Sequence, residues 1–139
     1  MLESDALRKT LFEAPAYSAE ESAHLFRAIH TLIEGLLLKG MSVVLDATNL
    51  SEHNRESLYR IADGMGSKLI LVRVSAPAEV VRERLKKRQA ARSGKSDADW
   101  EVYQKMKTSV EKIRRKHYTV DTSRDISPAI DRVVREALR

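Results

Sequence analysis

Apolar residues recur at helical spacing in one long segment near the start of the chain. Five of them fall three or four positions apart, or side by side on one face: Leu25, Ile29, Leu32, Ile33 and Leu36. This spacing predicts a helix with one buried face. Ser18 and Glu21 match a capping box at its start, with the glutamate reaching back to the cap, and Lys39-Gly40 marks its end.

Consecutive apolar residues mark two strands instead. Val43, Val44 and Leu45 stand together in 43–47, and "KLILVRVSA" spans 68–76. Such runs predict strands of a parallel sheet that are buried on both faces. "YTVDTS", 118–123, predicts a third, shorter strand.

The remaining segments predict helices between these strands. A short helix begins at Ser4 or Asp5 and reaches about Phe12, and others cover about 51–62, 77–91, 97–113 and the residues after 127. Alternation of strands and helices, with 15 to 25 residues between strands, predicts an α/β fold with a parallel sheet. The length of 139 residues predicts one domain.

Composition narrows the class of protein. No apolar run approaches the ~20 residues of a membrane span, so we expect no membrane association. The chain has no cysteine, which rules out disulfides and thiol chemistry and fits a cytoplasmic protein. Its net charge of +5 is local, because residues 82–95 carry seven basic residues and one acid. This run, and "KIRRKH" at 112–117, is either a solvated helix face or a surface for phosphates.

The stretch 89–96, "QAARSGKS", ends like the phosphate-binding loop G-x-x-x-x-G-K-[ST]. Its first position is Gln89 instead of glycine, and it follows a charged helix instead of a buried strand. A phosphate loop needs both features, because its glycines let backbone N–H groups converge on phosphate at a helix N-terminus. We therefore expect this stretch not to be a nucleotide site.

Six segments in fixed order carry a family resemblance: "ESDALRKTLF", "PAYSAEES", "GMSVVLDATNLSEHNRESL", "VRVSAPAEVVRERLKKR", "SDADWEVYQKM" and "VDTS". Together they resemble the P-loop kinases of the AAA-like group, which includes polynucleotide kinases and zeta toxins. The likeness covers nearly the whole chain. It implies a parallel-sheet, three-layer P-loop NTPase-like fold, ATP and Mg²⁺ as the family's cofactors, and a lid at about residues 82–107.

Family members begin with a strand, phosphate loop and helix that this sequence does not contain, a unit of roughly 30 residues. The resemblance therefore implies an N-terminally truncated, incomplete domain whose central strand is missing. A true start upstream of Met1 would explain the difference. The strands at 43–47 and 69–74 would flank the missing one and keep unpaired edges. From this we expect a homodimer, a rearranged sheet or strand exchange.

The resemblance also implies roles for individual residues. Asp5 matches the general base beside the acceptor hydroxyl, although it could merely cap the first helix. Arg8 matches an acceptor-binding arginine or is an ordinary exposed helix residue. Asp46, at the carboxyl end of a strand, matches the residue that holds Mg²⁺ or its water shell, and its alternative is a turn aspartate. Thr48, Asn49 and Arg55 match the substrate side, although Arg55 could simply lie on a helix surface.

Three arginines, Arg84, Arg88 and Arg92, fall at i, i+4 and i+8 on one helix face. Arg84 and Arg88 match the catalytic lid arginines of the family, which reach charge on the transferred phosphoryl group. Arg92 is a candidate contact to the nucleotide. A solvated basic helix is the alternative, above all for Arg92.

Three functions are consistent with these observations. The first is ATP-dependent phosphoryl transfer to a hydroxyl acceptor, either a small molecule or a nucleic-acid end, with the 139 residues alone expected to bind ATP weakly and to be inactive or nearly so. The second is a non-enzymatic, dimeric binding or regulatory domain. The third is nucleic-acid binding through the basic runs, which few aromatic residues accompany.

Overall fold

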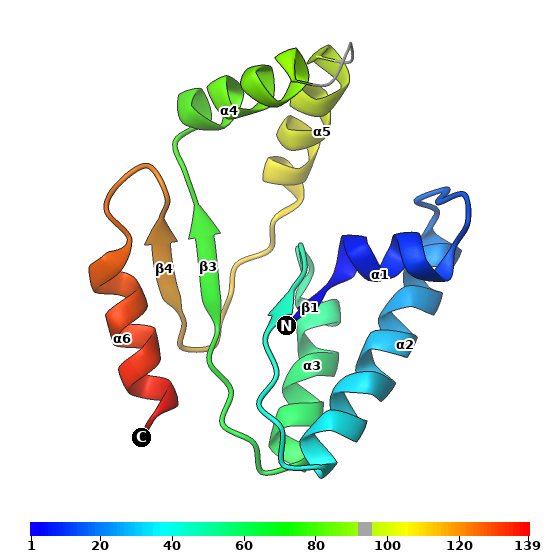
Figure 1. Cartoon of the computed structure of the whole chain (residues 1–139), viewed down its shortest axis with the longest axis vertical. Coiled ribbons are helices and arrows are strands. Elements are labelled where there is room, and N and C mark those ends of the chain that lie inside the picture. Colours follow the sequence, from blue (N-terminus) through cyan, green and yellow to red (C-terminus); the bar gives the residue numbers. More distant parts are fainter. Residues whose placement is uncertain (92–95) are drawn as a thin grey trace. The chain divides into compact units, whose positions relative to one another are not determined.

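The computed structural model describes residues 1–91 and 96–139, with side chains up to Ala91 and from Trp100 on. It is an α/β protein whose strands pair in parallel, as the sequence predicted. The described residues form two compact units, one of residues 1–49 and 53–69 and the other of residues 50–52 and 70–139. Figure 1 shows the elements in the order of the chain.

The first unit contains a short parallel strand pair and helices. In order these are β1 (Leu2–Glu3), α1 (Ser4–Leu11), α2 (Ala19–Leu38), β2 (Leu45–Asp46) and α3 (Glu52–Gly64). Leu2 lies opposite Leu45, and Glu3 lies opposite Asp46. Because the strands are parallel, their carboxyl ends and the residues that follow meet at the same edge of the sheet.

The core of this unit is the apolar face of α2 that the sequence predicted. Leu25, Ile29 and Ile33 are buried and in mutual contact. Partly buried residues of β1, α1, α3, β2 and the segment just before β2 pack around them, among them Leu2, Leu7, Val43, Leu45 and Leu58. Burial of these side chains is the main force that holds α1, α2 and the strand pair together.

Both ends of α2 have the predicted capping residues. The Ser18 hydroxyl accepts the Glu21 N–H at 3.1 Å. At the other end Gly40 has φ +71°, and the N–H groups of Gly40 and Met41 donate to carbonyls of the last turn. This left-handed position favours glycine. The partners of the Glu21 side chain differ from those predicted. Its carboxylate accepts hydrogen bonds from the N–H groups of Ala16 and Tyr17 instead of reaching back to Ser18.

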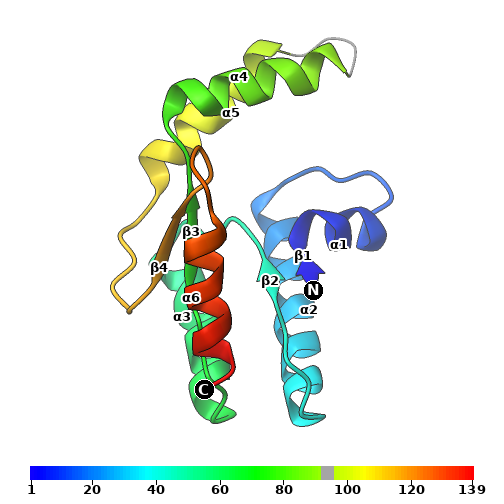
Figure 2. The ribbon, with the colours of Figure 1, turned by 60° about the vertical axis from the view of Figure 1, so that its left-hand side comes forward.

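The second unit has its own parallel pair of strands. Its elements are β3 (Val72–Ser75), α4 (Ala78–Ala90), α5 (Ser96–Ser109), β4 (Tyr118–Asp121) and α6 (Ser127–Ala137). Val72 lies opposite Tyr118, and Ser75 lies opposite Asp121. Helix α6 lies along β4, which Figure 2 shows from a second side.

Helices α4 and α5 form a hairpin with an aromatic contact. The guanidinium of Arg82 lies 5.5 Å from the centre of the Trp100 ring, and the Trp100 ring stacks on Tyr103 at 5.1 Å. A cation over an indole face is favourable, so Arg82 joins α4 to α5. The predicted lid, residues 82–107, falls on this hairpin.

The strands are shorter than the sequence predicted, and their burial differs. The valines Val44 and Val74 are 62% and 67% exposed, whereas burial on both faces was expected. That expectation was wrong because alternate residues of a strand point to opposite faces, and Val43 and Leu45 turn toward α2 while Val44 turns away. Helix α5 is also shorter than predicted and ends at Ser109 instead of near Ile113.

Among the described residues, β2 pairs only with β1, and β3 pairs only with β4. Each of these strands therefore has one edge with no strand beside it in the described part of the chain, as the sequence predicted. The same residues include no helix that is both long and apolar enough to cross a bilayer.

Candidate functional site

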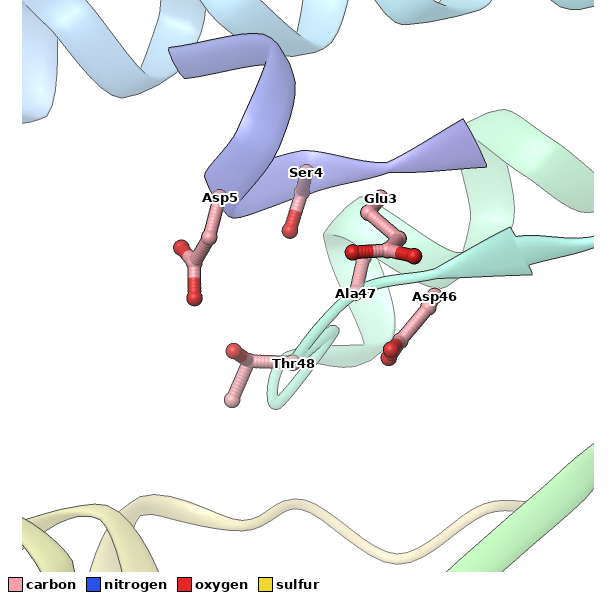
Figure 3. A pocket seen from close by; sticks show the side chains of 6 residues that line it. All are labelled: Glu3, Ser4, Asp5, Asp46, Ala47 and Thr48. Carbon is pink, nitrogen blue, oxygen red and sulfur yellow. The ribbon is translucent and has the colours of Figure 1, made fainter. Parts of the chain in front are cut away.

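A small pocket lies at the carboxyl ends of β1 and β2. Glu3, Ser4 and Asp5 line it from the first strand and the start of α1, and Asp46, Ala47 and Thr48 line it from the second strand and its loop (Figure 3). Its volume is about 110 Å³. In Figure 3 the side chains of Asp5 and Thr48 point into the same space. The structure thus brings together three predicted residues from two separate segments: Asp5 from the first, and Asp46 and Thr48 from the second.

The chemistry of this pocket is that of oxygen ligands. Glu3, Asp5 and Asp46 contribute carboxylates, Ser4 and Thr48 contribute hydroxyls, and no lining residue is basic. The three carboxylate residues are exposed, so water solvates their charges. Within the described residues no three His, Cys, Asp or Glu side chains come close enough to hold a metal ion by themselves. A cation here would complete its shell with water or with phosphate oxygens.

Arg8 does not line the pocket. It is 8% exposed and donates to Glu21 Oε1 at 2.5 Å and to the Ser22 hydroxyl at 3.1 Å. The Tyr17 ring covers its guanidinium, with 4.9 Å from Cζ to the ring centre. The alternative of an exposed helix arginine is therefore wrong, since Arg8 connects α1 to the start of α2. Its predicted contact with an acceptor stays a prediction.

Glu21 is the counterpart of Arg8 and was not predicted to touch it. The N–H of Ala16 and the Arg8 guanidinium both donate to its carboxylate, and the Tyr17 N–H adds a third bond. These donors, the Ala16 N–H first, hold the pKa of Glu21 below its ordinary value, against the opposing effect of burial. One carboxylate therefore fixes α1 and the loop before α2 together.

Arg55 is also buried and acts on the loop that follows β2. It is 5% exposed, and its Nη1 donates to the Asn49 carbonyl at 2.8 Å. Asn49 has φ +39°, a conformation that asparagine tolerates better than most residues. A helix-surface position for Arg55 is thus wrong. Arg55 holds the end of the loop that follows Asp46 and carries Thr48. The predicted substrate contacts of Arg55 and Asn49 stay predictions.

The predicted arginines of the lid have different environments. Arg84 donates from Nη1 to the Thr122 hydroxyl at 2.7 Å and from Nη2 to the Thr122 carbonyl at 2.6 Å. Arg88 is exposed and has no hydrogen bond or ion pair to another described residue. Arg92 lies outside the described residues. The three arginines therefore differ in what they contact, although the sequence gives them one helix face.

Thr122 and Asp121 form a turn at the carboxyl end of β4. The Asp121 carboxylate accepts the Ser123 hydroxyl at 2.6 Å and the Ser123 N–H at 2.9 Å. These two bonds, followed by the charges of Arg124 and Arg84, lower the pKa of Asp121. Asp121 remains a carboxylate at neutral pH, and the turn presents a fixed carbonyl to Arg84.

Comparison with known proteins assigns the chain to a family. An AAA domain model matches residues 1–113, which is most of the chain. The chain belongs to the AAA domain family. It is also similar to the crystal structure of a "putative kinase" from Chloroflexus aurantiacus J-10-fl, with a TM-score of 0.71 and 21% sequence identity. The likeness covers 99% of this chain and 80% of that one. None of the curated proteins matches the chain significantly.

This AAA domain therefore has a P-loop kinase-like fold, as its sequence predicted. Its residues fit Mg²⁺ better than they fit ATP. Mg²⁺ is commonly held by one or two carboxylates plus water and substrate phosphates, and Asp46 with Glu3 supplies such carboxylates. A nucleotide needs a larger space, because ligand pockets typically measure about 300–1,000 Å³. The pocket of about 110 Å³ is smaller than such sites and suits a hydrated ion or a hydroxyl group.

Sequence reasoning missed three residues of these sites in the AAA domain. Glu3 lines the pocket because it lies opposite Asp46 in the strand register, which the sequence did not fix. Glu21 was recognised only as a cap. Thr122 lies in "VDTS", a segment that was noted, but its bonds to Arg84 join residues 38 positions apart. A shared position at the end of a parallel strand is the one signal that could have found Glu3 and Thr122.

Proposed function

We propose that this AAA domain carries the acceptor side and the lid of an ATP-dependent kinase that phosphorylates a hydroxyl group. The observation that supports this most is the meeting of Asp5, Asp46 and Thr48 in one pocket. Open α/β sheets bind their ligands at the carboxyl ends of parallel strands, where this pocket lies. Its volume of about 110 Å³ suits a hydroxyl group and a hydrated cation.

In this proposal Asp5 is the general base. Its carboxylate accepts the proton of the acceptor hydroxyl while the hydroxyl oxygen forms its bond to the γ-phosphorus of ATP. The bond from that phosphorus to the bridging oxygen breaks, and ADP leaves with the electron pair. Asp5 suits this role because it is exposed in the pocket and no described hydrogen bond or ion pair occupies its carboxylate.

Asp46 is the residue that we propose for Mg²⁺, and Glu3 lies beside it. When bound, the ion neutralises phosphate charge. Thr48 is placed to orient the acceptor through its hydroxyl. Arg88 is the described lid arginine that is free to meet the transferred phosphoryl group.

We further propose that the 139 residues alone bind ATP weakly or not at all. Backbone N–H groups and the lysine of a phosphate loop supply much of the affinity for nucleotide, and no stretch of the printed sequence matches G-x-x-x-x-G-K-[ST]. Calorimetric titration with Mg²⁺–ATP should therefore give a dissociation constant above about 1 mM. Binding in the micromolar range would contradict this proposal.

The kinase proposal is tested by following the transfer of labelled γ-phosphate from ATP to a panel of sugars, nucleosides and oligonucleotide ends. ATP is supplied at about 10 mM, well above typical KM values. Asp5→Asn should lower any turnover by about 10²–10⁴-fold without changing nucleotide affinity. Glu13→Gln, an exposed carboxylate outside the pocket, is the matched control and should leave turnover unchanged. Equal turnover by Asp5→Asn and the wild type would remove Asp5 as the base. No transfer to any acceptor agrees both with weak ATP binding by the 139 residues and with the second candidate, which the oligomeric state tests separately.

The second candidate is a non-enzymatic module that associates through its strand edges. Val72 and Val74 are exposed on β3, and the exposed Val44 immediately precedes β2. Both strands have an open edge among the described residues, which favours pairing with a second copy. Light scattering across a range of protein concentrations should then give a dimer. Val74→Lys should weaken it, while Leu138→Lys, at the residue that follows α6 and also exposed, is the control. A monomer at all concentrations would argue against association.

A further inference from the structure

The hydrogen bonds of Arg84 distinguish it from Arg88, the other described residue of the three predicted lid arginines. Arg84 makes two bonds to one residue, at 2.7 Å to the Thr122 hydroxyl and at 2.6 Å to the Thr122 carbonyl. Bonds from a charged donor are stronger than neutral ones, and two from a planar guanidinium also fix its orientation. Arg84 lies in the middle of α4, and Thr122 immediately follows β4.

Thr122 is itself held in place. Its N–H donates to the Ser75 carbonyl at 2.9 Å, and its hydroxyl lies 3.3 Å from the same carbonyl, at the end of β3. Arg84 is therefore tied to the carboxyl ends of both strands of this sheet. The negative charge of Asp121 lies in the same turn and favours the arginine further.

We infer that Arg84 is a positioning residue that anchors the α4–α5 hairpin to the β3–β4 sheet through Thr122, which leaves Arg88 to meet phosphate. The anchoring stands on the hydrogen bonds alone, whereas the role of Arg88 rests on the proposed function. The two residues are one helical turn apart, so an anchor at Arg84 restricts where Arg88 can reach. Beyond the anchor, the hairpin has its own internal contact between Arg82 and Trp100.

The chain offers a direct probe, because Trp100 is its single tryptophan and lies on α5. The Trp100 indole N–H gives one isolated nitrogen–proton NMR signal. Its ¹⁵N relaxation reports picosecond–nanosecond motion, and relaxation dispersion reports motion in the microsecond–millisecond range. The measurement needs neither nucleotide nor acceptor, so it tests the anchor even if the kinase proposal fails.

Arg84→Gln should increase the mobility of the indole and of the α4 amides. The indole chemical shift should move little, since Tyr103 still stacks on Trp100. Thr122→Val should act in the same direction, and Thr122→Ser, which keeps the hydroxyl, should restore wild-type relaxation. Arg88→Gln is the matched control on the same helix and should leave relaxation unchanged.

The double variant Arg84→Gln/Thr122→Val separates an anchor from general loosening of the fold. If the two residues act through one contact, the double variant should be no more mobile than Arg84→Gln. Wild-type relaxation in Arg84→Gln, or an equal gain of mobility in Arg88→Gln, would overturn the inference. In an active preparation Arg88→Gln should lower kcat, whereas loss of kcat in Arg84→Gln alone would assign the phosphate contact to Arg84 instead.

Discussion

Glu3 and Asp46 are direct partners across the parallel β1–β2 pair, and both carboxylates border the same pocket. Like charges opposite each other on neighbouring strands destabilise a sheet. The pair persists in a sheet of only two residues per strand, where each interaction matters more. A cation bound between the carboxylates would remove this repulsion.

Replacement of one partner should stabilise the protein in the absence of metal. Glu3→Gln removes the repulsion and should raise the free energy of unfolding by about 0.5 kcal/mol, measured by urea denaturation in the presence of a chelator. Glu13→Gln, in the loop after α1, should have no such effect. Added Mg²⁺ should raise the midpoint more in the wild type than in Glu3→Gln. A destabilised Glu3→Gln would show that the carboxylate has a favourable partner instead.

Asn49 should be replaceable by glycine but not by alanine. Its φ of +39° strains most side chains, and its buried Oδ1 has no hydrogen-bond partner among the described residues. Asn49→Gly should be about as stable as the wild type or more so, because it relieves the strain and removes the unpaired oxygen. Asn49→Ala should lose about 1 kcal/mol, since alanine tolerates a positive φ less well than asparagine does. Thermal denaturation of both variants makes the comparison, and equal stabilities would contradict it.

Stability should fall in acid through Glu21. The pKa of Glu21 lies below its ordinary value of 4.5 in the folded protein, so the unfolded chain binds the proton more readily. The stabilising contribution is therefore complete above about pH 4.5 and is lost as the pH falls through the folded pKa. Glu21→Gln should be less stable than the wild type at neutral pH, with the difference shrinking in acid. Asp121 and Asp125 also have lowered pKa values and should keep part of the slope in the variant.

The core of the first unit should depend on α2. Leu25 is fully buried, and Leu25→Ala should cost about 2–5 kcal/mol of unfolding free energy. Leu32 lies on the same helix but is 40% exposed, so Leu32→Ala should cost only about 1 kcal/mol. Urea denaturation of both variants tests whether the buried face or helix propensity stabilises this unit. Similar losses would point to propensity.

Helices and core residues were predictable because their signals are local. The spacing of Leu25, Ile29 and Ile33 fixes one face of α2, and Ser18 and Gly40 mark where it begins and ends. Burial of the strands was not predictable in the same way. Apolar runs predict burial on both faces, but the exposure of Val44 depends on which elements cover each side of β2.

Individual residues of the site could be predicted from the sequence, but the contacts that hold them could not. Asp5 was placed in the site by the family resemblance, whereas Asp46 follows an apolar run, so its position at a strand end could be inferred from the sequence. The burial of Arg8 and Arg55 could not, because their partners, Glu21 and the Asn49 carbonyl, depend on how helices and loops pack. The bond from Arg84 to Thr122 is likewise a product of the tertiary fold.

A strand pair of two residues each cannot keep its own shape, so the spacing of Asp5 and Asp46 depends on the helices behind it. Leu2 and Leu45, on the same strands, pack against the buried face of α2. Random mutagenesis with selection for activity should consequently recover loss-of-function variants at Ile29 and Ile33 as well as at the carboxylates. Such distant variants would be rescued by low temperature or by global stabilising substitutions, whereas changes to Asp5 would not.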